Sequence, residues 1–198
     1  YLKLINKAKQ KLKEINIADD EFLKAVARYY FKLMAYKDEY EVARLYTNGE
    51  FKKNLYKAFE GDLKLKFHLA PPLFAPRDPN TGKLKKITIG AWILPIFKIL
   101  SKFKFLRGTI FDPFGKTQER RKERLLINQY LNDINSILDK INSNNVTLAI
   151  QIASIPEMIR GYGHVKEENI SKASEKREDL LKLWRSKNRD DLKIKAAE

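Results

Sequence analysis

Hydrophobic positions recur every three or four residues along most of the chain, which is the period of an amphipathic helix. The clearest run spans residues 118–141, where the apolar positions are Ile127, Tyr130, Leu131, Ile134, Ile137, Leu138 and Ile141. Similar spacing predicts helices over residues 1–16, 21–36, 38–46, 50–59, 92–106 and 146–155, and a last helix from about residue 165 past Trp184. The pattern therefore predicts a mainly α fold.

The middle third of the chain follows a different period. Over residues 63–69, leucine and phenylalanine alternate with lysine and histidine, which predicts a half-buried strand. Pro71 and Pro72 end this strand, and residues 78–82 have the composition of a tight turn. Residues 83–89 then predict a second strand that pairs with the first. We therefore expect a small two-stranded β-element inside a helical domain.

The domain organisation follows from these elements. Residues 1–18 are interpreted as a linker or lead-in helix, and residues 19–198 as one helical domain. Asp19, Asp20 and Thr117 are predicted N-caps, because their side chains can accept hydrogen bonds from the free N–H groups of a first helical turn.

Composition narrows the chemistry. Hydrophobic residues make up 43% of the chain, enough for a core. The absence of cysteine excludes disulfides, iron–sulfur clusters and cysteine-bound zinc. The two histidines, His68 and His164, are far apart in sequence, so no metal site is predicted. The longest apolar stretch, residues 91–100, is too short to span a bilayer, and we expect a cytoplasmic protein.

The formal net charge of +15 favours an acidic partner, although lysine-rich composition alone can also produce it. Arg120, Arg121, Lys122 and Arg124 crowd the first turns of the long helix, where cations oppose the helix dipole. One interpretation is a docking patch for an acidic surface. The alternative is a solvated helix start that Glu119 and neighbouring acids partly neutralise.

The segment from Arg160 to Lys166 is the most specific local arrangement in the sequence. Glycines at 161 and 163 allow a sharp turn, and Arg160, His164 and Lys166 then meet at a helix N-terminus, which favours anions. We predict an anion-binding or substrate-entrance corner there. The alternative is that Arg160 pairs with a carboxylate such as Glu157 or Glu167 and fastens two helices.

Two further observations concern catalysis. His68 lies on the lysine face of its strand, where it is either a proton-transfer group or anion contact, or a solvated or lightly hydrogen-bonded side chain. No catalytic motif is recognisable: Gly115-Lys116-Thr117 lacks the upstream glycine of a phosphate loop, and neither a nucleophile elbow nor a dinucleotide fingerprint is present. The segment alone is therefore predicted to be inactive.

Five segments together resemble the C-terminal region of the single-chain indolepyruvate ferredoxin oxidoreductases, a family of 2-oxoacid:ferredoxin oxidoreductases. The resemblance covers roughly residues 21–173, with the segments in the same order and at similar spacing. They are Lys32-Leu33-Met34-Ala35-Tyr36-Lys37-Asp38-Glu39-Tyr40-Glu41-Val42-Ala43-Arg44-Leu45-Tyr46, Phe59-Glu60-Gly61-Asp62, Phe67-His68-Leu69-Ala70-Pro71-Pro72, Asp112-Pro113-Phe114-Gly115 and Glu157-Met158-Ile159-Arg160-Gly161-Tyr162-Gly163-His164-Val165-Lys166.

The resemblance implies an accessory domain of a larger enzyme that oxidatively decarboxylates a 2-oxoacid to an acyl-CoA. In that family thiamine diphosphate, magnesium and the iron–sulfur clusters belong to other domains, which agrees with the lack of cysteine in this chain. The implied partners are the other domains of the enzyme, with ferredoxin as a further candidate. A chain that begins with Tyr1 instead of methionine agrees with this expectation.

Two alternatives remain at this point. The first is a stand-alone basic module that binds RNA or an acidic protein. Nucleic acid is the less favoured ligand, because no strand alternates aromatic and basic residues as an RNA-binding sheet does. The second is peripheral membrane binding through residues 92–106. Lysines 98, 102 and 104 fall on more than one side of that helix, so no membrane partner is expected.

Overall fold

The computed structural model describes residues 1–17, 20–36, 38–69, 76, 85–161 and 163–197, with side chains described up to Asn188. The chain divides into two compact units, each built around its own hydrophobic core. Unit 1 consists of residues 1–36 and 123–198, and unit 2 consists of residues 37–122. Unit 2 is therefore an insertion in the sequence of unit 1.

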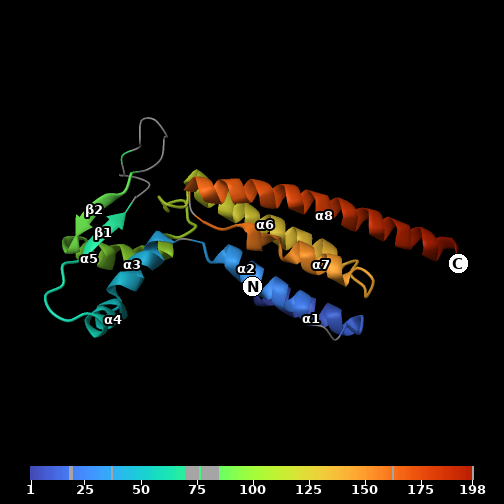
Figure 1. The fold of residues 1–198 in the computed structure, drawn as a ribbon, viewed down its shortest axis with the longest axis horizontal. Coiled ribbons are helices and arrows are strands. Elements are labelled where there is room, and N and C mark those ends of the chain that lie inside the picture. Colours follow the sequence, from blue (N-terminus) through green and yellow to red (C-terminus); the bar gives the residue numbers. More distant parts are fainter. Residues whose placement is uncertain (18–19, 37, 70–75, 77–84, 162, 198) are drawn as a thin grey trace. The chain divides into compact units, whose positions relative to one another are not determined.

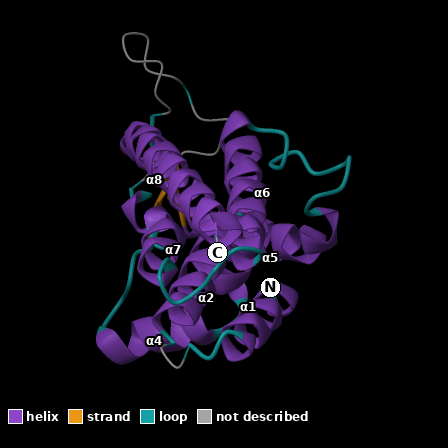
Figure 2. Ribbon diagram, turned by 90° about the vertical axis from the view of Figure 1, so that its right-hand side faces the viewer, coloured by secondary structure: helices purple, strands orange, loops and turns teal. Residues whose placement is uncertain are grey.

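Unit 1 is a helical bundle. Its elements are α1 (Leu2–Glu14), α2 (Glu21–Met34), most of α6 (Gln118–Leu138), α7 (Val146–Ala153), the 3₁₀ turn η3 (Ile155–Met158) and α8 (Gly163–Ala197). Figures 1 and 2 show α8 running along α6 and α7, with α2 on the other side of α7. The core contains apolar side chains that recur every three or four residues in the sequence. Fully buried among them are Phe22, Val26, Ile134, Ile137 and Leu138.

The first helix belongs to this core. Leu4, Ala8 and Leu12 recur every four residues on one side of α1, and all three are buried in the same cluster as Phe22 and Val26. The predicted boundary at residue 18 therefore does not separate a linker from the domain. The N-terminal helix is held by burial of its apolar side chains, about 25 cal/mol per Å² of surface removed from water.

Unit 2 combines short helices with a small sheet. Its elements are α3 (Glu39–Thr47), α4 (Glu50–Ala58), β1 (Lys66–Leu69), β2 (Ile87–Gly90), the 3₁₀ turn η1 (Ala91–Ile93), α5 (Leu94–Lys102) and the 3₁₀ turn η2 (Phe103–Leu106). β1 and β2 are antiparallel, with Lys66 opposite Gly90 and Leu69 opposite Ile87. Figure 2 shows this pair as the only strands among the described residues.

The core of unit 2 is small and aromatic. Phe67 from β1 and Phe97 from α5 are buried together with Ala43 and Ile93. The Tyr46 ring lies 5.1 Å from Phe67 and 5.8 Å from Phe97 between centroids, so three elements meet at these rings. Offset and edge contacts of this kind add about 0.5–1.5 kcal/mol per pair beyond burial.

The predicted fold class is confirmed: the protein is mostly helical, with a two-stranded antiparallel sheet in its middle third. Both strands are shorter than predicted, and the turn at residues 78–82 lies outside the described residues. The predicted helix over 92–106 is divided into η1, α5 and η2. Pro95 lacks an N–H, so it cannot close an α-helical bond to the carbonyl of Ala91.

The predicted helix caps have different outcomes. The Thr117 hydroxyl accepts a hydrogen bond from the Arg120 N–H at 3.4 Å, which caps α6. Asp20 is the N-cap residue of α2, but its side chain makes no capping bond. Asp19 lies outside the described residues. Within the described part of the chain, no helix has both the length and the apolar character needed to cross a bilayer.

Candidate functional site

The turn that precedes α8 adopts the conformation its glycines permit. Gly161 and Gly163 have φ values of 86° and 56°, in the left-handed region that other residues rarely occupy. A Cβ on Gly161 would lie 2.9 Å from Val165 Cγ1, so the turn also needs the missing side chain for space. α8 begins at Gly163, two residues before the predicted start.

The three predicted anion-binding residues lie around this turn, and two of them have acidic partners. Arg160 Nη2 lies 2.9 Å from Glu157 Oε1, and Arg160 Nε donates to the Glu157 carbonyl at 3.0 Å. Lys166 Nζ donates to Glu123 Oε1 at 2.5 Å. His164 is exposed. The alternative interpretation of Arg160, a pair with Glu157, therefore matches the observed geometry.

The two ion pairs differ in burial. The Arg160 and Glu157 side chains are 68% and 54% exposed, so water screens their attraction and the pair is worth little. The Lys166 and Glu123 side chains are only 20% and 4% exposed, and they join α8 to α6. The Lys166–Glu123 pair therefore connects two helices, whereas the Arg160 guanidinium remains accessible to solvent.

Lys32 on α2 is a member of this site that the sequence analysis missed. Its ammonium donates to the carbonyls of Pro156 at 2.8 Å and Glu157 at 3.2 Å. Burial lowers the pKa of Lys32, the positive charge of Arg160 lowers it further, and Glu157 acts in the opposite direction. Lys32 is 124 residues from Pro156 in sequence, so no local pattern could have indicated the contact.

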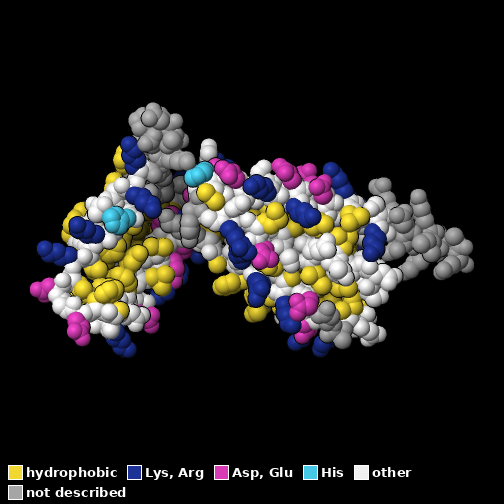
Figure 3. Space-filling view, in the orientation of Figure 1, with side chains coloured by type: hydrophobic (Ala, Val, Ile, Leu, Met, Phe, Trp, Pro, Cys, Tyr) yellow, Lys and Arg dark blue, Asp and Glu magenta, His cyan; other side chains and the backbone are white. Residues whose placement is uncertain are grey.

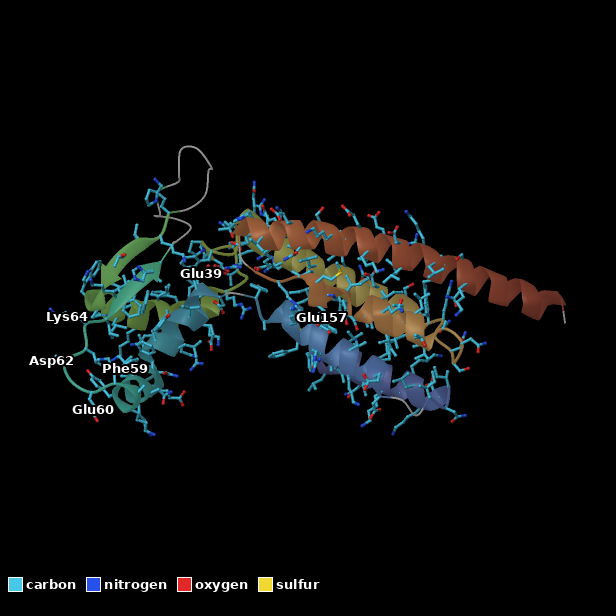
Figure 4. All side chains as sticks on the ribbon, in the orientation of Figure 1. Glu39, Phe59, Glu60, Asp62, Lys64 and Glu157 are labelled. Atoms are coloured by element: carbon cyan, nitrogen blue, oxygen red, sulfur yellow. The ribbon has the colours of Figure 1, made fainter. Side chains whose placement is uncertain are left out.

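A second contact joins α2 to Glu157, this time through the Glu157 side chain. The Tyr29 hydroxyl donates to Glu157 Oε2 at 2.9 Å. Burial, and then this hydrogen bond, raise the pKa of Tyr29. We call Lys32, Arg160, Lys166, Glu157 and Glu123 the cation cluster; its three cations and two carboxylates leave one net positive charge. Figure 4 labels Glu157, which lies beside α2.

A hollow in unit 1 lies beside the cation cluster. Its lining is mostly apolar and includes Leu33, Pro156 and Ile159, which directly neighbour Lys32, Glu157 and Arg160 in sequence. At its polar edge Arg177 binds Asp133 through Nε at 2.5 Å and Nη2 at 2.7 Å, a bidentate pair that joins α8 to α6. The cavity volume is about 30 Å³, which is room for about one water molecule and not for a substrate-sized ligand.

The predicted docking patch needs one correction. Arg120 is buried, and its guanidinium binds Glu39 Oε1 at 3.0 Å, with side-chain exposures of 5% and 13%. Arg120 therefore fastens α6 to α3 inside unit 2 and does not present its charge at the surface. Arg121 and Lys122 are exposed, and Arg124, which belongs to unit 1, is half-buried.

His68 stands in the strand pair of unit 2. Its Nδ1 lies 3.0 Å from Thr88 Oγ1, directly across the ladder. The side chain is exposed, which agrees with its predicted place on the lysine face. His68 belongs to unit 2, and the turn before α8 belongs to unit 1.

Asp112 organises a loop in unit 2 that the sequence analysis did not single out as a site. Its carboxylate accepts hydrogen bonds from Gly108 N–H at 2.9 Å, Phe114 N–H at 3.1 Å and the Tyr40 hydroxyl at 3.2 Å. Burial acts to raise the pKa of Asp112, but these bonds and one from Gly115 N–H together lower it. Burial and the Asp112 charge raise the pKa of Tyr40 to about 12.

Among the residues that the structure describes, no group of three or more histidine or acidic side chains is placed to hold a metal ion. A comparison with protein-family models matches residues 1–179 to the family described as "Family of unknown function (DUF6537)". No curated protein and no solved structure matches the chain.

Proposed function

We propose that this chain, which belongs to the DUF6537 family, is the C-terminal accessory domain of a single-chain indolepyruvate (2-oxoacid) ferredoxin oxidoreductase. In this proposal it supports the oxidative decarboxylation carried out by the full enzyme and is not catalytic alone. The observation that carries the proposal is the set of five ordered segments through which the sequence resembles that family.

The contacts among these segments support an accessory role. Lys32, in the first segment, binds the carbonyl of Glu157, in the last. Tyr40, also in the first segment, donates to Asp112, and its ring meets Phe114 edge-on at 5.4 Å. Tyr46, at the end of the first segment, packs on Phe67. The five segments thus include side chains that stabilise each unit, as expected if they specify the fold of an accessory domain.

The proposal assigns the thiamine diphosphate, magnesium and iron–sulfur sites to other domains of the parent enzyme. The reading frame upstream of Tyr1 tests it directly. We expect that frame to encode a thiamine-binding domain and cysteine-rich cluster domains. A start codon close to Tyr1, with no such domains in the same polypeptide, would contradict the proposal.

In this proposal the cation cluster also lies at the entrance through which an anionic substrate reaches the parent enzyme. The parent reaction involves a 2-oxoacid carboxylate and the phosphates of coenzyme A, and Arg160 is the exposed cation of the cluster. We expect His164→Ala and Arg160→Gln in the full enzyme to raise a KM with little change in melting temperature. A lower melting temperature with unchanged KM values would assign the turn a purely structural role.

A stand-alone basic interaction module is the second candidate function. The observation that favours it is the charge of unit 2, which contains 19 Lys and Arg residues against nine Asp and Glu residues. Gel-shift titration with single-stranded RNA at two salt concentrations tests this candidate. Tight, salt-sensitive binding would favour it, because phosphate contacts release counterions.

A further inference from the structure

An apolar stripe runs along the outside of η1, α5 and η2 in unit 2. Trp92, Ile96, Ile99 and Phe103 follow one another at steps of four, three and four residues, so they share one side of the helix. Their exposed fractions are 66%, 49%, 60% and 42%. We call these four residues the outer stripe.

The outer stripe is distinct from the side of α5 that forms the core. Ile93, Phe97 and Leu100 lie next to it round the helix and pack in the small core of unit 2. The Trp92 ring lies against Gly90, where a Cβ would be 3.3 Å from Cδ1. Unit 2 thus leaves a row of large apolar side chains in water, and exposed apolar patches of this kind commonly mark interaction surfaces.

A row of lysines borders the outer stripe. Lys98 and Lys102 are exposed and four residues apart, and at about 100° per residue they lie across the stripe from the buried side of α5. Residues 91–106 contain no Asp or Glu. The remaining lysine of the segment, Lys104, binds Glu41 at 2.9 Å. The margin of the stripe is therefore positive.

Unit 2 as a whole also carries a positive charge. Nineteen cations and nine acids give unit 2 a net charge of +10, out of +15 for the chain. Figure 3 shows apolar side chains gathered on one face of unit 2, with Lys and Arg above and beside them and acidic side chains along the lower edge. A second copy of the chain would bring two positive fields together, so self-association is disfavoured, and an acidic surface is complementary.

A protein surface fits the outer stripe better than a lipid surface. At about 100° per residue the outer stripe covers an arc of about 60°, which is narrower than the arc of about 100° that an amphipathic helix buries. Exposed Trp and Phe side chains bordered by charged residues are typical of protein interfaces.

The geometry points to a docking surface: the outer stripe, with Lys98 and Lys102 at its margin, binds an acidic protein surface with an apolar centre. This inference rests on the proposed function, because the partner surface belongs to the remainder of the parent polypeptide. Trp92 and Phe103 anchor the contact by burial. The two lysines set its register and make its strength depend on salt.

Hydroxyl-radical footprinting of the natural full-length polypeptide tests the inference, with the 198-residue chain as reference. Tyr56 on α4 is the internal standard, because its exposed fraction of 66% equals that of Trp92. We expect the ratio of the Trp92 oxidation rate to the Tyr56 oxidation rate to be about fivefold lower in the full polypeptide than in the 198-residue chain, because residues buried in a protein interface are shielded from water. Ile96→Ser with Ile99→Ser should restore its oxidation rate. Leu125→Ser, a matched change at a 56% exposed residue of unit 1, should not.

The possible outcomes are separable. An unchanged Trp92 oxidation rate in a full polypeptide that does carry the thiamine and cluster domains overturns the docking surface and leaves the proposed function standing. A frame without those domains overturns both, because the partner would not exist. Protection of Trp92 in the 198-residue chain by phosphatidylserine-containing vesicles, without protection in the full polypeptide, identifies a membrane surface and overturns the protein partner.

Discussion

The hydrogen-bonded turn at Asp112 predicts a large effect for a small change, Gly115→Ala. A Cβ on Gly115 would lie 2.5 Å from Asp112 Oδ2 and 2.9 Å from its Cγ, closer than real Cβ contacts. The carboxylate cannot stay in place, yet its position is set by three backbone N–H groups and the Tyr40 hydroxyl. The added methyl group must therefore break some of these bonds.

The expected cost follows from the bonds that are lost. A hydrogen bond to a charged group contributes about 1.5–3 kcal/mol. If the carboxylate loses two of its four donors, the loss is about 3–6 kcal/mol, and the lower chain entropy of alanine returns only about 0.4–1 kcal/mol. We expect Gly115→Ala to destabilise unit 2 by about 2–6 kcal/mol.

Native-state hydrogen exchange read by mass spectrometry is the suitable assay, because it reports the two units separately. Amides of α3 and α5 should exchange faster in Gly115→Ala, whereas amides of α7 should not change. Gly90→Ala is the matched control, since its Cβ would meet only the exposed Trp92 ring at 3.3 Å, and that ring can move. Equal exchange in the two variants would refute the reasoning.

Three further predictions concern charged residues. The pKa of Asp112 is lowered in the folded state. Its contribution to stability is therefore present above the unfolded pKa near 4 and is lost as the pH falls through the folded pKa. We expect the melting temperature of Asp112→Asn to fall less steeply with decreasing pH than that of the wild type. Lys166→Met should lower the melting temperature of unit 1, because the buried Glu123 carboxylate loses the Lys166 ammonium and the contact that joins α8 to α6; an unchanged melting temperature would contradict this. Arg121→Gln with Lys122→Gln should slow ferredoxin reduction by the full enzyme, most at low salt; a rate with unchanged salt dependence would count against a docking role for these residues.

Local patterns in the sequence determined the elements of this fold. The three-to-four-residue period located α2, α6 and α8, and the alternation over residues 63–69 located β1, because side-chain direction in a helix or strand repeats with a fixed period. Gly161 and Gly163 predicted the turn before α8 for a similar reason, since a positive φ is a property of single residues.

Contacts between distant residues were decided by the tertiary structure. Arg120 was predicted to lie at the surface, but Glu39, 81 residues away, draws it into unit 2. Lys32 belongs to the cation cluster because its ammonium donates hydrogen bonds to the carbonyls of Pro156 and Glu157. A charged residue has the same local pattern whether its partner is water or a distant carboxylate, so the sequence could not distinguish the two.

The same limit applies to α5 and α1. The sequence of α5 is apolar on two adjacent sides, and only packing against Phe67 decided that Phe97 faces the core while Ile96 and Ile99 face water. α1 has the pattern of a lead-in helix, yet Leu4 and Leu12 complete the core of unit 1. Periodicity determines which residues share a side of a helix, but the choice of which side is buried depends on elements that the chain brings in from far away.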